Sequence, residues 1–136
     1  MNVITQEILD NLSAEARQSP RGRKNYNFHE NLDAPAQRLL NALEPGTEIP
    51  VHRHPHTAET YFVVRGKVCV SFFDDNGKPT NSAELCPTQE NYGVHIPAGT
   101  WHGLEVLESG TVIFEVKDGP YTPISPSDIL TRTLSA

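Results

Sequence analysis

Through most of the chain, short segments rich in β-branched and aromatic residues alternate with turns made of glycine and proline. In one of them, Val68, Val70 and Phe72 alternate and would lie on one face of a strand. The sequence Asp-Asp-Asn-Gly that follows predicts a hairpin, because Asn-Gly accepts positive φ angles. The pattern predicts strands at 36–42, 60–64, 67–72, 94–96, 101–107 and 111–117. Short strands separated by such turns are typical of an all-β sandwich or small barrel.

The two ends of the chain differ from this β-patterned middle. A short amphipathic helix is predicted at 4–16, because apolar residues recur there every four positions and share one face. These residues are Ile4, Ile8, Leu12 and Ala16. We expect a single domain in three parts: an N-terminal helix and basic arm over 1–35, a barrel over 36–118, and a proline-rich tail packed on the barrel over 119–136.

The excess of acidic over basic residues bears on which partners the protein can bind. The chain has 136 residues, with 11 basic and 17 acidic side chains and a formal net charge of −6. We therefore expect no nucleic-acid partner and no membrane partner. No apolar run approaches the roughly 18 residues of a membrane span, and Cys69 and Cys86 form no CxxC pattern. With no basic region typical of a secretory signal at the N-terminus, we expect a reduced, cytoplasmic protein.

Histidines are unusually grouped in this sequence. His52 and His54 are two residues apart, so on a strand they would point to the same side. Glu59 follows shortly after them, and His102 lies far along the chain on another predicted strand. Neutral imidazoles with one carboxylate suit Zn, Fe or Ni, and the carboxylate also accepts Mn. The pattern indicates one divalent metal ion, held by His52, His54, Glu59 and His102 near the mouth of the barrel.

The spacing of these residues resembles the two sequence motifs of the cupin superfamily. The matching strings are Gly46-x5-His52-x-His54-x4-Glu59-x6-Gly66 and Pro97-x-Gly99-x2-His102. The second motif departs from the cupin pattern at Asn91, where a glycine is expected, and at Val106, where an asparagine is expected. The resemblance implies a double-stranded β-helix, the cupin or RmlC-like jelly roll, with a short N-terminal helix. It also implies that the two histidines and the glutamate of the first motif bind the metal together with the histidine of the second.

Longer stretches are similar to the WbuC-type cupin-fold metalloproteins. They cover residues 19–29, 39–47, 97–102 and 114–121. Members of that family are small bacterial cupins, some of them encoded among genes for O-antigen sugar biosynthesis. The resemblance implies a small metalloenzyme that acts on a polar or anionic small molecule in bacterial surface-polysaccharide (O-antigen) sugar metabolism. Two alternatives stay open: a non-enzymatic metal- or sugar-binding cupin that serves as a sensor or accessory subunit, and a metal-free sugar epimerase, against which the intact ligand set argues.

A local group of cations, from Arg17 to Lys24, precedes a run of polar and aromatic residues. It is either a solvated connector or an anion-binding segment that folds over the barrel mouth of its own or a neighbouring subunit. The residues expected to bind the small-molecule ligand, which is anionic or sugar-derived, are Arg23, Lys24, Asn27, His29 and Tyr61. The residues expected to move protons are His56 and Tyr26, although His56 could also be an alternative metal ligand or an exposed loop histidine.

Exposed sheet edges and outward apolar residues favour a homodimer. Phe62, Val64 and Ile113 are expected to face outward and to need such cover. Trp101 precedes His102 directly, so the strand would direct it away from the metal to the outside of the barrel.

Overall fold

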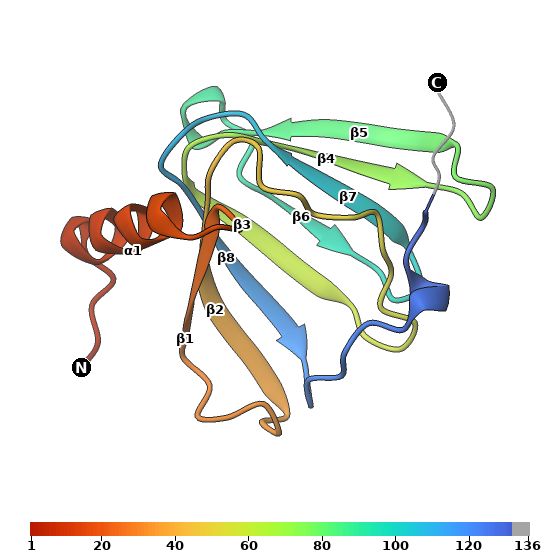
Figure 1. Cartoon of the computed structure of the whole chain (residues 1–136), viewed down its shortest axis with the longest axis horizontal. Coiled ribbons are helices and arrows are strands. Elements are labelled where there is room, and N and C mark those ends of the chain that lie inside the picture. The colour runs from red at the N-terminus through yellow and green to blue at the C-terminus, as the bar shows by residue number, and fades with distance from the viewer. Residues whose placement is uncertain (132–136) are drawn as a thin grey trace.

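The computed structural model describes residues 1–131, and its strands form two antiparallel sheets (Figure 1). In chain order the elements are α1 (Gln6–Gln18), β1 (Arg23–Asn27), β2 (Ala36–Leu43), β3 (Glu59–Arg65), β4 (Val68–Phe73), β5 (Pro79–Leu85), η1 (Pro87–Gln89), β6 (Gly93–Ile96), β7 (Trp101–Val106), β8 (Thr111–Asp118) and η2 (Pro126–Asp128). The larger sheet has the order β1-β2-β8-β3-β6, and the smaller sheet has the order β5-β4-β7. The predicted all-β architecture with one N-terminal helix is confirmed.

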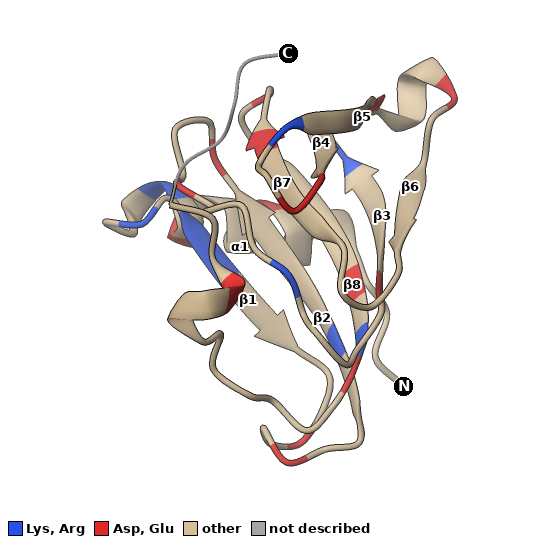
Figure 2. Ribbon diagram, turned by 90° about the vertical axis from the view of Figure 1, so that its right-hand side faces the viewer, with Lys and Arg blue, Asp and Glu red and all other residues tan. Residues whose placement is uncertain are grey.

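Each predicted strand is present, with its ends shifted by no more than one residue. The sequence pattern does not predict β1 or β5, and both are polar strands at the edge of a sheet. An edge strand can leave most of its side chains in solvent, so it needs no regular apolar alternation. The basic residues that precede and enter β1 thus belong to the border of the larger sheet (Figure 2).

Apolar side chains from both sheets meet in one core. The core consists of Leu43, Tyr61, Val63, Val68, Val70, Leu85, Ile96, Val106 and Ile113. The expectation that Ile113 faces outward is wrong, because this side chain is buried among these residues. Phe62 and Val64 do face outward from β3 and are exposed. Dimerisation through that outer face stays a prediction.

Helix α1 covers part of the outer face of the larger sheet, where it contacts β1, β2 and β8. The helix begins after Thr5, whose hydroxyl accepts a hydrogen bond from the backbone N–H of Ile8. Ile4 therefore precedes the helix and is exposed, contrary to the predicted apolar face. The face that is buried against the sheet consists of Leu9, Leu12, Ser13 and Ala16.

The C-terminal segment, residues 119–131, lies at the end of the molecule away from helix α1 (Figure 1). The backbone N–H of Tyr121 donates to the carbonyl of Leu32, and that of Leu130 donates to the carbonyl of Val51. This part of the predicted tail packs on the barrel beside residues 51–54, whereas residues 132–136 of the tail lie outside the described residues. Within residues 1–131, no helix combines the length and the apolar character that a membrane crossing requires.

Candidate metal centre

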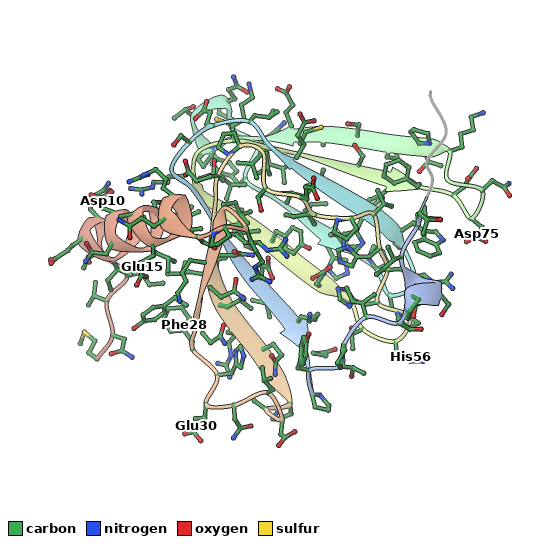
Figure 3. All side chains as sticks on the ribbon, viewed as in Figure 1. Asp10, Glu15, Phe28, Glu30, His56 and Asp75 are labelled. Carbon is green, nitrogen blue, oxygen red and sulfur yellow. The ribbon has the colours of Figure 1, made fainter. Side chains whose placement is uncertain are left out.

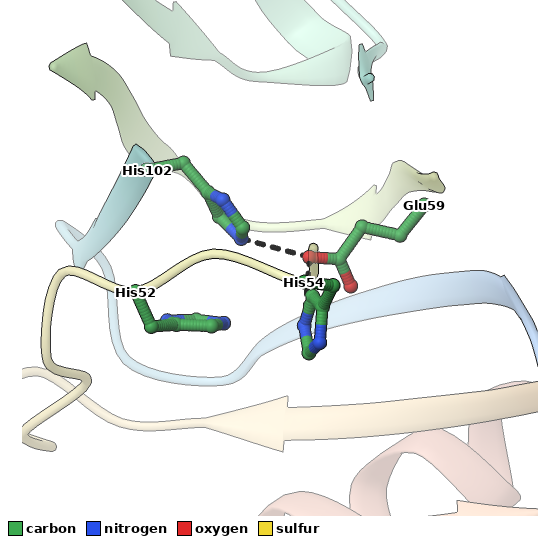
Figure 4. Close-up of side chains that lie close together, drawn as sticks. All are labelled: His52, His54, Glu59 and His102. Atoms are coloured by element: carbon green, nitrogen blue, oxygen red, sulfur yellow. Dashed lines mark ion pairs between the residues drawn. The ribbon is translucent and has the colours of Figure 1, made fainter. Parts of the chain in front are cut away.

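Three separate parts of the chain bring the four predicted metal ligands together (Figure 4). His52 and His54 lie on the connection between β2 and β3, Glu59 begins β3, and His102 is the second residue of β7. The expected strand through His52 is reduced to isolated bridges. The backbone N–H of His52 donates to the carbonyl of His102 at 3.0 Å, and the reverse hydrogen bond is 2.9 Å long. This pairing holds the irregular segment against β7.

The ligand atoms of these side chains lie close together. The Nε2 atom of His102 is 2.8 Å from Oε1 of Glu59, and Nε2 of His54 is 3.4 Å from the same oxygen. The four ligand atoms all lie within 4.8 Å of one another. Donor atoms bound to one divalent ion at about 2.0–2.2 Å are separated by roughly 3–4 Å, so the cluster already has approximately the size of a coordination shell.

The hydrogen bonds of two imidazoles fix which nitrogen carries the proton. Nδ1 of His52 is 2.9 Å from the carbonyl oxygen of Pro50, and Nδ1 of His102 is 2.9 Å from that of Thr100. A carbonyl oxygen can only accept, so both Nδ1 atoms must donate, and in each neutral ring Nε2 presents a lone pair. Burial, followed by the charge of His102, lowers the pKa of His52 to about 4, so this ring is neutral at pH 7.

The centre of the cluster is therefore rich in electron pairs. Nε2 of His102 and Oε1 of Glu59 are buried, and neither has a hydrogen-bond partner within residues 1–131. Facing lone pairs on buried atoms are costly unless a cation lies between them. The residues present thus fit a divalent cation.

A cavity of about 280 Å³ opens over this cluster. Its floor includes the metal-ligand side chains, and its walls come from both sheets and from the C-terminal segment. Besides the cluster itself, its charged and amide-bearing lining residues are Arg21, Arg23, Asn25, Asn41, Glu115 and Lys117. Pockets that bind small molecules usually have volumes of roughly 300–1,000 Å³. This cavity therefore suits a small, polar molecule.

Two of the predicted ligand-binding residues, Arg23 and Tyr61, line this cavity. Tyr61 is also part of the core, and burial raises the pKa of its hydroxyl. Three other residues are predicted to bind the ligand, namely Lys24, Asn27 and His29. In the described part of the chain, residues 1–131, none of these three lines the cavity. His29 instead accepts a hydrogen bond at Nδ1 from the backbone N–H of Arg38.

The two residues predicted to move protons also lie elsewhere. The ring of Tyr26 packs edge-on against Phe28, at a centroid distance of 5.3 Å. His56 is exposed and lies near η2 (Figure 3), where it lines a second cavity of about 190 Å³ together with His54. The catalytic roles of Tyr26 and His56 stay predictions.

Two residues of the cavity wall, Asn41 and Glu115, did not stand out in the sequence. Nδ2 of Asn41 donates to Oε1 of Glu115 at 3.2 Å. Burial, followed by the charge of Glu59, raises the pKa of Glu115 to about 7. The side chain of Lys117, whose direction the sequence left open, also reaches this cavity. The available signal was the alternation of Ile113, Glu115 and Lys117 along β8, which places all three on the same face.

Several solved structures share this architecture. Capsular polysaccharide assembling protein CapF from Staphylococcus aureus is 21% identical with a TM-score of 0.61, and the match covers 85% of this chain and 33% of CapF. TT1209 from Thermus thermophilus is 22% identical with a TM-score of 0.60, over 87% of this chain and 97% of that protein. The cupin domain of Cnp3 from Schizosaccharomyces pombe is 12% identical with a TM-score of 0.56, over 71% of this chain and 64% of that chain.

These likenesses show the fold, which is the cupin jelly roll that the two sequence motifs predict. No curated protein matches the chain. A family model described as "Domain of unknown function (DUF6016)" matches residues 4–85, which is more than half of the sequence. The chain therefore has the cupin fold and belongs to the DUF6016 family.

Proposed function

We propose that the protein is a small metalloenzyme that binds one divalent cation and acts on a polar or anionic small molecule. The contact between Nε2 of His102 and Oε1 of Glu59 carries this proposal, because a cation is the partner that both buried atoms lack within residues 1–131. Three imidazoles and one carboxylate leave coordination positions open on Zn, Fe, Mn or Ni. A cation bound there polarises a carbonyl group or lowers the pKa of a bound water.

The cavity wall supports the chemistry of this substrate. Arg23 and Lys117 offer charged donors to an anionic group. Glu115, with its pKa raised to about 7, can take up or release a proton near neutral pH beside the metal ligands. The likeness to CapF and the resemblance to the WbuC-type cupins support a setting in surface-polysaccharide sugar metabolism, although this chain spans only about a third of CapF.

Metal analysis of protein purified without chelator or nickel resin tests the metal centre. We expect close to one Zn, Fe, Mn or Ni ion per chain in the wild type and almost none in His54→Ala. The matched control is His95→Ala, which removes an exposed imidazole hydrogen-bonded to Thr60 and should keep the ion. If the wild type takes up no ion after incubation with each of the four cations, the proposal is wrong.

Activity tests on the metal-loaded protein then distinguish an enzyme from a non-enzymatic binding protein. A screen of sugar phosphates, nucleotide sugars and small carboxylic acids should find a compound that is converted, with the conversion lost in His54→Ala and retained in His95→Ala. A compound that binds tightly to the loaded protein but is never converted would contradict the enzyme and favour a sensor or accessory subunit.

A further inference from the structure

A polar strip runs across the inner face of the larger sheet, from the metal cluster to the sheet edge. Lys117 is the cross-strand partner of Glu59, so its side chain leaves β8 beside the metal end of the cavity. At the other end, Asn25 on β1 is the cross-strand partner of Asn41 on β2, and both line the cavity. The cavity is therefore polar along the β1, β2 and β8 side.

The edge strand β1 divides its side chains between the cavity and the solvent. Arg23 and Asn25 line the cavity, whereas Lys24, between them, is exposed and points away. Arg21, just before the strand, also reaches the cavity. Arg21 and Arg23 thus line the same cavity, and burial, followed by the charge of Arg21, lowers the pKa of Arg23. The guanidinium group of arginine is effectively always charged in proteins.

The three cations that line this cavity outnumber the two carboxylates in the same lining. Among residues 1–131, Arg21, Arg23 and Lys117 form no ion pair within 4.0 Å. Nη1 of Arg23 donates to the backbone carbonyl of Glu48, which leaves its remaining N–H groups free for a ligand. The cavity is thus a locally basic site in a chain with a net charge of −6, and such a site attracts anions.

We propose that the cavity binds a small molecule with two anionic groups, one carboxylate at the metal ion beside Lys117 and a second carboxylate or phosphate at Arg21 and Arg23. This inference rests on the proposed metal centre and adds the class of substrate. A guanidinium group binds a carboxylate or phosphate through two parallel hydrogen bonds, so the arginine pair favours a planar or tetrahedral oxyanion over a hydroxyl group. The volume of about 280 Å³ limits the ligand to the size of a small diacid or a phosphorylated short-chain acid.

Cobalt-loaded protein tests this inference, because the visible spectrum of Co²⁺ reports binding of a carboxylate to the ion. Acetate is compared with the dicarboxylates malonate, succinate, glutarate and adipate. We expect at least one dicarboxylate to bind ten times more tightly than acetate. Arg23→Gln and the exposed Arg21→Gln should each reduce that advantage severalfold, with acetate affinity unchanged. The matched control is Lys24→Gln, which removes the neighbouring charge on the outer side of the same strand and should change neither affinity.

The outcomes separate the inference from the metal centre on which it rests. If the wild type takes up no cobalt, the metal centre fails. If it takes up one cobalt ion per chain but no dicarboxylate binds more tightly than acetate, the two-anion ligand is excluded while the metal centre stands. Equal losses of dicarboxylate affinity in Arg23→Gln and Lys24→Gln would also contradict binding of the second anion by Arg21 and Arg23. The affinity would then depend on the net charge of the protein and not on the position of the cation.

Discussion

The Nε2 atom of His102 lies 2.8 Å from Oε1 of Glu59, and each side chain is no more than 3% exposed. Since Nδ1 of His102 donates to the carbonyl of Thr100, a neutral ring would turn a lone pair toward the carboxylate oxygen. Two acceptors at this distance repel each other unless a proton or a metal ion lies between them. The two sheets therefore bring Glu59 of β3 and His102 of β7 together at a site that a bound cation would stabilise.

The first prediction is that zinc stabilises the folded protein through this pair. At a free zinc concentration 100 times the Kd, mass action adds about 2.7 kcal/mol to the free energy of unfolding. Calorimetry should show a higher Tm for the wild type in zinc and no shift for His102→Ala. His95→Ala serves as the control, because His95 is exposed and hydrogen-bonded to Thr60. An equal zinc shift in His102→Ala and the wild type would place the zinc outside this cluster.

The strands and the metal ligands could be predicted from the sequence because both depend on local spacing. Alternate apolar residues mark strands wherever one face is buried, as Val68 and Val70 show in β4. The histidine motif brings its side chains together because His52 and His54 are two residues apart and the backbone of His52 pairs with that of His102. Both the alternation within a strand and the spacing of the histidines can be read without knowing how the rest of the chain packs.

The part of the cavity wall that β8 forms could not be predicted, because this strand turns its more polar set of alternate residues toward the inside of the barrel. Val112, Phe114 and Val116 form the more apolar set of alternate residues on this strand, so the pattern directs them to the core. In the structure Val112 and Phe114 face the other way and pack under helix α1. Glu115 therefore points into the barrel. The alternation along β8 places Glu115 on the same face as Ile113, but the packing of helix α1 on the opposite face decides that this set points into the barrel.

The second prediction concerns the pH dependence of the metal-free protein. The pKa of Glu115 is raised from 4.5 to about 7 in the folded state, so the protonated form is favoured by folding. The stability that this group contributes is complete below about pH 4.5 and is lost as the pH rises through 7. Glu115→Gln should therefore be more stable than the wild type at pH 8, by at most about 3.5 kcal/mol at 1.4 kcal/mol per pKa unit.

Urea unfolding of both proteins at pH 4 and pH 8 measures this difference. At pH 4 the two free energies of unfolding should nearly coincide, because Glu115 is then mostly protonated in both the folded and the unfolded wild type. An exposed carboxylate supplies the control: Glu84→Gln should give the same small change at both pH values, since Glu84 lies on the exposed part of β5. A Glu115→Gln effect that is independent of pH would show that the carboxyl group is not buried in the way described.

The third prediction compares alanine substitutions at Gly46 and Gly66, which have the same φ of +91°. The comparison distinguishes the cost of backbone strain from the cost of steric crowding. A Cβ atom at Gly66 would lie 2.7 Å from Cα of Thr111, whereas a Cβ atom at Gly46 would meet nothing within 4 Å. Gly46→Ala should cost about 1–2 kcal/mol for the backbone conformation alone. Gly66→Ala should cost about 1–3 kcal/mol more, because the buried Thr111 cannot move without strain. Equal losses in urea unfolding would show that the Thr111 contact relaxes freely.

The fourth prediction concerns the contact that holds the C-terminal segment beside the metal centre. Nε of Arg53 donates to Oδ1 of Asp128 at 2.8 Å, and the guanidinium group lies 4.4 Å from the centre of the Trp101 ring. Trp101, expected on the outside of the barrel, is thus buried there beneath Arg53 of its own chain. Two residues beyond Asp128, the N–H of Leu130 donates to the carbonyl of Val51. The ion pair therefore lies where the C-terminal segment meets residues 51–54, which include His52 and His54.

Asp128→Asn removes the charge but keeps the shape, and a partly buried ion pair of this kind contributes about 1 kcal/mol. Hydrogen exchange of the Leu130 amide should accelerate severalfold in this variant, since its protection depends on local closure. The zinc affinity should fall with it, because Ile129 forms a bridge with His52 and the segment holds that ligand in place. Glu84→Gln, which breaks the exposed ion pair with Lys67, is the matched control and should change neither quantity. Faster exchange at Leu130 with an unchanged zinc affinity would mean that His52 is positioned by its pairing with His102 alone.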